Sequence, residues 1–110
     1  NVFVHIGSQD DTNFLSKIND EYGPFDIIID DGHHGTDYQV RAMGLYLPLL
    51  KKGGLYVIED IQHEYPKYSA FEDPYGMLEA ALPDEYTYVF HDLREVSGRQ
   101  DDSMMAIRHV

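Results

Sequence analysis

Acidic and imidazole side chains stand at the ends of two apolar segments of the sequence. Asp30 and Asp31 close the first segment, and His34 follows three positions after Asp31. Glu59 and Asp60 close the second segment. Carboxylate oxygens are the ligands that Mg²⁺, Mn²⁺ and Ca²⁺ prefer, and an imidazole can take up a proton near neutral pH. These residue types suit a divalent-metal site beside a general base, provided that the fold brings the two segments together.

The two acidic pairs follow segments that we expect to be neighbouring strands. Residues 25–29 form a nearly continuous apolar run, which is typical of a strand covered on both faces near the centre of a parallel sheet. Residues 55–58 form the next strand, and a helix lies between the two. A strand–helix–strand unit makes its strands parallel, so both acidic pairs are expected at one edge of the sheet, where open α/β sheets bind ligands.

The intervening helix has its own signals. Thr36 is expected to open it, with Gln39 three residues later as a capping-box partner. Lys51 and Lys52 are expected in its last turn, at the negative end of the helix dipole, before two glycines end it. One apolar stripe should face the core, formed by Val40, Met43, Leu47 and Leu50.

The remaining segments predict a single α/β domain over residues 1–110. The other expected elements are a strand over 2–6, a helix capped by Asp11 or Thr12, a short helix capped by Asp73, and strands over 86–90 and 103–108. The last two strands are expected to form an antiparallel hairpin. The fold class is therefore a doubly wound α/β sheet with an antiparallel pair at its end.

Each candidate site residue also has an ordinary structural interpretation. Asp30 or Asp31 alone would equally suit a turn or a helix cap, and Asp30 is the more structural of the two because strand alternation points it away from Asp31. His33 and His34 would ordinarily be solvated loop residues. The coincidence favours a site, because two adjacent strands both end in acidic pairs and a histidine directly follows one of them.

Composition limits the classes of function. The chain has 20 acidic and 8 basic residues and a formal charge of -12, which disfavours binding to nucleic acids or anionic membranes. It contains no cysteine, so thiolate metal sites and cysteine nucleophiles are excluded. There is no apolar stretch of membrane-spanning length and no visible signal peptide, so a cytoplasmic location is the default expectation.

The acidic segments resemble a known family of enzymes. Residues 25–34 and 53–60 read FDIIIDDGHH and GGLYVIED. They resemble the macrolide and sugar O-methyltransferases of the mycinamicin type and the related cephalosporin-hydroxylase-like proteins. Their spacing is also similar to that of catechol O-methyltransferase, a class I enzyme that uses S-adenosylmethionine. The resemblance covers nearly all of the chain, which corresponds to the later part of such a domain.

The resemblance implies a role for each residue of the acidic cluster. Asp31, Glu59 and Asp60 would be the ligands of Mg²⁺ or of Mn²⁺ or Ca²⁺ in its place. His34 would be the catalytic base that takes the proton from the acceptor hydroxyl. The metal would bind the acceptor oxygen and lower its pKa.

The beginning of the chain resembles the part of the family that contacts the cofactor, S-adenosylmethionine. Ser8 and Gln9 match a strand-end segment that contacts adenine in catechol methyltransferases, although the macrolide group usually has Asp at the position of Ser8. Asp30 completes the candidate cofactor-binding residues. A simple turn before the Asp11 cap is an equally good interpretation of Ser8 and Gln9.

The sequence departs from the family in one respect. It has no Gly-x-Gly turn and no second strand ending in a ribose-binding acid, so we expect a Rossmann-like class I methyltransferase sheet that lacks its first two strands. Those strands would lie between 2–6 and 25–29, so the strand over 25–29 should expose an edge. Unpaired edges pair with something. We therefore expect a homo-oligomer, a swapped strand, or the strand over 2–6 moved into the gap.

The expected function is S-adenosylmethionine- and Mg²⁺-dependent methyl transfer to a hydroxyl of a small molecule such as a sugar or natural product. The chain as given is expected to be an incomplete and inactive fragment of that enzyme. Two alternatives remain open: a metal-dependent hydrolase that uses the same carboxylates with His33 and His34, and a non-catalytic remnant of the fold. The tyrosine-rich segment 64–68 would suit a lid or an acceptor wall.

Overall fold

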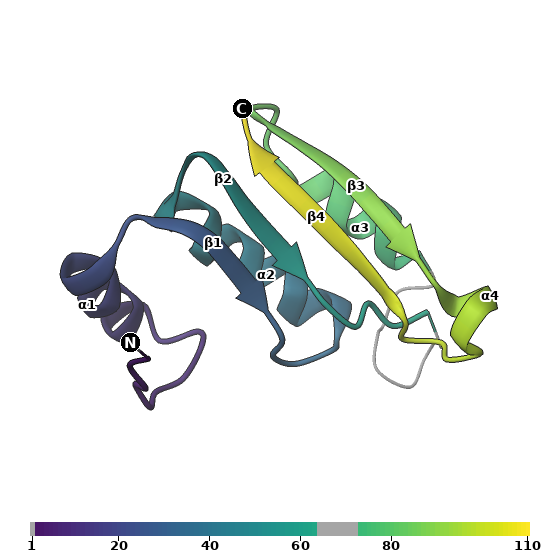
Figure 1. The fold of residues 1–110 in the computed structure, drawn as a ribbon, viewed down its shortest axis with the longest axis horizontal. Coiled ribbons are helices and arrows are strands. Elements are labelled where there is room, and N and C mark those ends of the chain that lie inside the picture. Colours follow the sequence, from purple (N-terminus) through teal and green to yellow (C-terminus); the bar gives the residue numbers. More distant parts are fainter. Residues whose placement is uncertain (1, 64–72) are drawn as a thin grey trace.

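The structure, a computed structural model, describes residues 2–63 and 73–110 (Figure 1). The segment 64–68, expected as a lid or acceptor wall, lies outside the described residues. The elements are α1 (Thr12–Tyr22), β1 (Phe25–Asp30), α2 (Thr36–Tyr46), the 3₁₀ turn η1 (Leu47–Leu49), β2 (Leu50–Ile58), α3 (Pro74–Ala81), β3 (Tyr86–Asp92), α4 (Arg94–Ser97) and β4 (Ser103–His109). None of the helices in these two ranges is long and apolar enough to span a membrane.

The four strands form one sheet in the order β1-β2-β4-β3. β1 and β2 are parallel, and β4 runs antiparallel to both of its neighbours, β2 and β3. The parallel pair with its crossover helix α2 and the antiparallel hairpin at the end are both as the sequence predicts. The expected edge is also confirmed, because β1 is an edge strand of the sheet that the described residues form.

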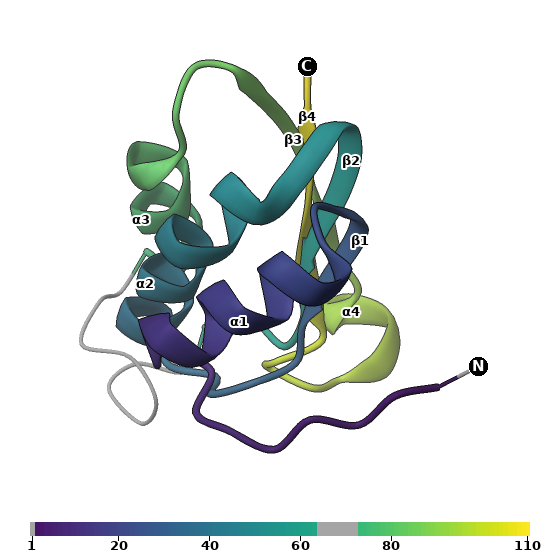
Figure 2. The same ribbon diagram turned by 90° about the vertical axis from the view of Figure 1, so that its left-hand side faces the viewer.

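One face of the sheet carries the hydrophobic core. The registers align Asp30 with Ile58, Ile58 with Met105, and Met105 with Phe90 in a row across the four strands. Ile58 and Met105 are fully buried. α2 and α3 lie on this side of the sheet, and α1 lies beyond the β1 edge (Figures 1 and 2). The predicted apolar stripe, which continues from α2 into η1 and the start of β2, faces the core. The buried cluster includes Met43, Leu47, Leu50, Tyr56, Ile61, Leu78 and Ile107.

The opposite face of the sheet is apolar but open in the described part of the chain. The neighbouring row runs from Ile29 through Val57 and Ala106 to Val89. Ile29 is 60% exposed and Val89 is 57% exposed. The prediction that both faces of the 25–29 strand are covered is therefore wrong for the described residues: only the face toward α2 is covered.

The segment 2–6 is not a strand. It has no regular secondary structure, and Val2, Val4 and Ile6 are almost fully exposed. A strand needs a partner for its backbone hydrogen bonds, and β1 does not supply one here, so β propensity alone does not produce the predicted strand. Instead, the ring of Phe3 stacks on Tyr22 of α1, which also hydrogen-bonds His5.

The limits of α2 also differ from the prediction. Its N-cap is Gly35, which makes no side-chain cap, so the expected capping box does not form. The helix gives way to the 3₁₀ turn at Leu47, where Pro48 has no N–H to continue the α-helical bonding. Lys51 and Lys52 consequently lie in β2 and not in a helical last turn.

Two other predicted caps are confirmed. The Asp11 carboxylate accepts hydrogen bonds from the backbone N–H groups of Asn13 and Phe14, at 3.0 and 3.3 Å. The Asp73 carboxylate caps α3 in the same way. The loop expected between the hairpin strands contains the short helix α4, which the sequence analysis did not predict.

Ile58 provides a test of which sheet face supports the fold. Ile58→Ala should lower the free energy of unfolding by about 2–5 kcal/mol, because the side chain is fully buried against the core. Ile29→Ala, on the open face of the adjacent strand, is the matched control and should cost less than about 1 kcal/mol. Urea denaturation followed by circular dichroism would measure both. Equal losses would contradict the assignment of the core to one face.

Candidate metal centre

The pairing of β1 with β2 places the two acidic pairs side by side. Asp30 aligns with Ile58 at the end of the parallel ladder. The ladder continues one residue further, because the backbone N–H of Glu59 donates to the carbonyl of Asp30 at 3.0 Å. Asp31 and Asp60 therefore leave the sheet at the same edge, as predicted from the strand–helix–strand pattern.

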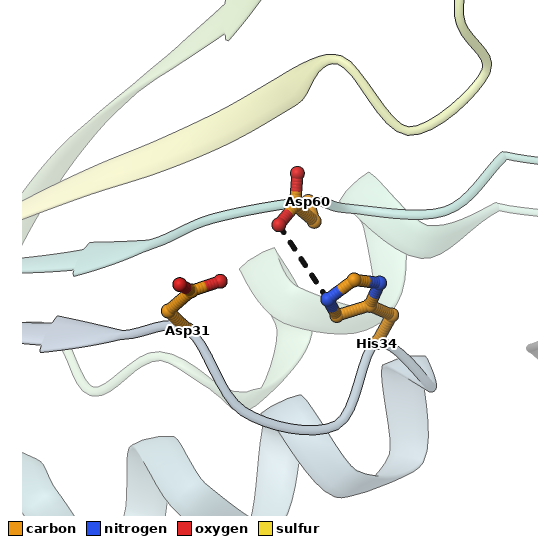
Figure 3. A group of neighbouring side chains, drawn as sticks. All are labelled: Asp31, His34 and Asp60. Carbon is orange, nitrogen blue, oxygen red and sulfur yellow. Dashed lines mark ion pairs between the residues drawn. The ribbon is translucent and has the colours of Figure 1, made fainter.

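Three of the predicted residues form one cluster. Asp31, His34 and Asp60 each offer a ligand atom, and these atoms lie within 4.8 Å of one another (Figure 3). The Nε2 atom of His34 lies 3.5 Å from Oδ2 of Asp60. Both of these side chains are about one-third exposed, so the cluster is open to small solutes.

Glu59 lies beside this cluster and is not one of its three members. Burial raises the pKa of Glu59, and repulsion from Asp31 and then Asp60 raises it further. Burial also raises the pKa of Asp60; attraction to His34 opposes this shift, while Asp101 and Asp31 add to it. The negative charges at the ends of β1 and β2 are thus only partly neutralised by His34.

The donor set fits a divalent cation. Asp31 and Asp60 present oxygen atoms at a mutual distance that one ion can bridge, and Glu59 adds a further carboxylate nearby. Hard oxygen ligands with room for water or substrate are typical of Mg²⁺ and Mn²⁺ sites. A bound cation would also remove the repulsion that raises the pKa values of Glu59 and Asp60.

Asp60 has an unusual backbone conformation. Its φ of 54° lies in the left-handed region, which only glycine adopts without strain. Asp tolerates this region better than most residues, at a cost of about 1–2 kcal/mol. The Asp60 carboxylate lies toward His34 (Figure 3).

Asp30 has a different environment from Asp31, as strand alternation predicts. It is 5% exposed, and its carboxylate accepts hydrogen bonds from the Tyr56 hydroxyl and from the backbone N–H of Gly32, both at 3.1 Å. Burial raises the pKa of Asp30, which these two hydrogen bonds partly oppose. Asp30 therefore supports the turn that carries Asp31, and its expected contact with cofactor stays a prediction.

Ser8 and Gln9 lie in an irregular segment close to this turn. The backbone carbonyl of Gln9 accepts a hydrogen bond from the Tyr46 hydroxyl at 2.5 Å. The side chain of Gln9 lies so close to Gly32 that a Cβ atom there would collide with it. Ser8 donates to the carboxylate of Asp10. The structure thus brings Gln9 next to Gly32, which directly follows Asp31, and adenine contact by Ser8 and Gln9 stays a prediction.

His33 is directed away from the cluster. Its Nδ1 atom accepts a hydrogen bond from the backbone N–H of Gly35 at 2.9 Å, and its ring lies 4.1 Å from that of Tyr38. It therefore does not join Asp31, His34 and Asp60 in the group of possible ligands.

Two residues that support the site are not among the candidates that the sequence predicts. The sequence predicts Tyr56 only as part of a strand and Gln39 only as a capping residue. Tyr56 nevertheless hydrogen-bonds the carboxylate of Asp30, and Gln39 hydrogen-bonds the backbone carbonyl of Glu59. Strand alternation provided a signal for Tyr56, because it shares the core face with Ile58 and a buried tyrosine hydroxyl needs a partner.

Part of the chain is similar in sequence to known O-methyltransferases. No family model matches the chain. It is 49% identical over 59 residues to 8-demethyl-8-(2-methoxy-alpha-L-rhamnosyl)-tetracenomycin-C 3'-O-methyltransferase of Streptomyces olivaceus, a match to 54% of this chain and 15% of that protein. It is 44% identical over 69 residues to mycinamicin VI 2''-O-methyltransferase of Micromonospora griseorubida, covering 62% of this chain and 17% of the relative.

The fold is similar to a solved methyltransferase. MycE methyltransferase from the mycinamycin biosynthetic pathway, in complex with Mg, SAH and mycinamycin VI, matches 96% of this chain with a TM-score of 0.70 and 27% identity. A second MycE structure, in complex with Mg and SAH, matches the same share with a TM-score of 0.68 and 25% identity. The chain covers 31% and 32% of the two MycE chains.

The fold is therefore that of part of a class I methyltransferase. The resemblance that the strand-end motifs indicated is confirmed: the chain is similar to part of the macrolide and sugar O-methyltransferases. It matches less than a fifth of the length of these curated relatives.

Removing one charge should stabilise the metal-free chain. The pKa values of Glu59 and Asp60 are raised in the fold, so their ionised forms cost stability at neutral pH, and this cost disappears as the pH falls through the raised values. Asp31→Asn should therefore raise the Tm in EDTA near neutral pH, and the gain should shrink toward about pH 4. The control is Asp84→Asn at an exposed position. A lower Tm for Asp31→Asn at neutral pH would contradict the repulsion.

Proposed function

We propose that this chain supplies the metal-binding and base-bearing part of an S-adenosylmethionine-dependent O-methyltransferase. The observation that carries the proposal is the cluster of Asp31, His34 and Asp60 at the shared end of β1 and β2. MycE, which has a similar fold, has been solved in complex with Mg and SAH.

The metal ligands are assigned to Asp31, Asp60 and the adjacent Glu59. A bound divalent cation would act as a Lewis acid that lowers the pKa of an acceptor hydroxyl. The three side chains would hold the cation at the strand ends, where the parallel ladder fixes the relative positions of Asp31 and Glu59. Rigidly held ligands would orient the acceptor oxygen, and such orientation contributes to the rate of methyl transfer.

His34 is assigned as the general base. Its Nε2 atom faces the cluster, so this nitrogen is the one that would take up the proton of the acceptor hydroxyl. Asp60, 3.5 Å away, would stabilise the imidazolium that forms. The cofactor contacts are assigned to Gln9 and Ser8, which lie in the segment that reaches the Asp31 turn.

The acceptor is proposed to be a hydroxyl group of a sugar attached to a natural product. One relative is named as the 3'-O-methyltransferase of a rhamnosyl tetracenomycin C and another as the 2''-O-methyltransferase of mycinamicin VI, and one MycE complex contains mycinamycin VI. The hydrolase alternative is not favoured, because His33 is directed away from the cluster and the relatives are methyltransferases. A homo-oligomer and a cytoplasmic location stay predictions.

Metal binding tests the ligand assignment directly. The 110-residue chain should bind Mn²⁺ in calorimetric titration, and Asp31→Ala should weaken that binding by about 10-fold or more because it removes a ligand. Asp84→Asn keeps the same overall charge change with an exposed residue and should bind as the unaltered chain does. Equal affinity in all three proteins would refute the metal assignment.

His34→Ala separates the base from the ligands. In a complete enzyme containing this chain, with S-adenosylmethionine, Mg²⁺ and a glycosylated acceptor, it should lower kcat by about 10²–10⁴-fold because no group takes the proton. Formation of S-adenosylhomocysteine would measure the rate. Mn²⁺ affinity should remain close to that of the unaltered protein. A large loss of Mn²⁺ affinity with kcat preserved at saturating metal would instead make His34 a ligand.

A further inference from the structure

Gln39 occupies an unusual position for a glutamine. It lies in the first turns of α2 and is 2% exposed, beneath the turn that follows β2. Its side-chain Nε2 donates hydrogen bonds to the backbone carbonyl oxygens of Glu59 at 3.2 Å and of Asp60 at 3.4 Å. One buried amide group thus binds the main chain of both acidic residues at the end of β2.

The backbone of the acidic turn depends on few contacts. The N–H of Glu59 donates to Asp30, and the N–H of Ile61 donates to the carbonyl of Ser103, each at 3.0 Å. Between these two anchors lie the carbonyl groups of Glu59 and Asp60, and Asp60 has its φ of 54°. Gln39 is the side chain that binds these two carbonyls within residues 2–63 and 73–110.

The amide of Gln39 is not explained by packing. Its Oε1 atom is buried and has no hydrogen-bond partner in the described part of the chain. Burying an unpartnered polar atom costs stability, and an apolar side chain of the same length would avoid that cost. The two hydrogen bonds from its Nε2 atom to the carbonyls of Glu59 and Asp60 are therefore the contacts that distinguish glutamine from methionine at this position.

Gln39 also connects the two halves of the cluster. Its backbone N–H makes the first α-helical hydrogen bond of α2, to the carbonyl of the N-cap residue Gly35, directly after His34, at 3.0 Å. Its side chain holds the Asp60 turn. The same residue therefore links the loop that carries His34 to the turn that carries Asp60, and the two side chains face each other at 3.5 Å.

We propose that Gln39 is a positioning residue of this centre: its buried amide holds the main chain of Glu59 and Asp60 in the conformation that directs both carboxylates toward Asp31 and His34. This inference rests on the proposed function, since the benefit of that conformation is metal binding. It gives Gln39 an indirect role, because its side chain contacts the backbone of ligands and not the metal.

The test compares Gln39→Met with Thr36→Val in the 110-residue chain. Methionine keeps the length of the side chain and removes the donor nitrogen. Thr36 lies one turn earlier on α2 and is fully buried, and its hydroxyl has no hydrogen-bond partner among the described residues. Thr36→Val therefore removes a buried polar group without removing a hydrogen bond. The probe is Mn²⁺ in calorimetric titration. Gln39→Met should bind Mn²⁺ about 10-fold more weakly, and Thr36→Val should bind it as the unaltered chain does.

Amide hydrogen exchange gives a second readout that needs no metal. In Gln39→Met the amides of Glu59 and Ile61, which donate to the carbonyls of Asp30 and Ser103, should exchange faster than in the unaltered chain, while those of β4 stay unchanged. If Gln39→Met does not fold, Gln39→Asn retains the amide but shortens its reach, and the same two changes are expected. Unchanged Mn²⁺ affinity together with unchanged exchange in a folded variant would overturn the inference. Failure of the unaltered chain to bind Mn²⁺ would overturn the metal site, and the exchange rates would then decide the role of Gln39 alone.

Discussion

The parallel pairing of β1 with β2 is the constraint on which the rest of this structure depends. It brings together Asp31 and Asp60, which lie 29 positions apart in the sequence. The ladder extends one hydrogen bond beyond the last aligned pair, from the Glu59 N–H to the carbonyl of Asp30. When two parallel strands end at the same level, the residues that follow them lie together at the carboxyl ends of the strands. The identity of those residues as carboxylates and an imidazole then turns a common sheet edge into a candidate metal centre.

The same arrangement costs stability in the absence of a cation. Burial and mutual repulsion raise the pKa values of Glu59 and Asp60, and the left-handed backbone at Asp60 adds strain. Asp30 is a buried carboxylate whose partners are Tyr56 and a backbone N–H. Costs that gather at one place are typical of functional sites.

Much of the fold could be predicted because local patterns coincide with tertiary contacts. The apolar run before Asp30 and the shorter one before Glu59 identify both strands, and Asp11 caps its helix as expected. The errors occur where a local signal competes with distant partners. Residues 2–6 have β propensity but no neighbouring strand, and Gln39 has the spacing of a capping box but bonds a turn 20 residues away. Sequence spacing does not encode such partners.

The candidate site has two parts, which differ in how the described chain supports their backbone. Asp31, His34 and Asp60 stand on a strand ladder and on a helix that buries its apolar stripe, and their backbone supports lie within the described chain. Ser8 and Gln9 stand instead in an irregular segment that joins no strand, beside a sheet edge and an apolar face that remain open. The geometry of metal ligands therefore follows from contacts inside this chain. Precise placement of a cofactor beside Ser8 and Gln9 also needs rigid structure on the far side of the cofactor. An uncovered edge strand does not provide that structure by itself.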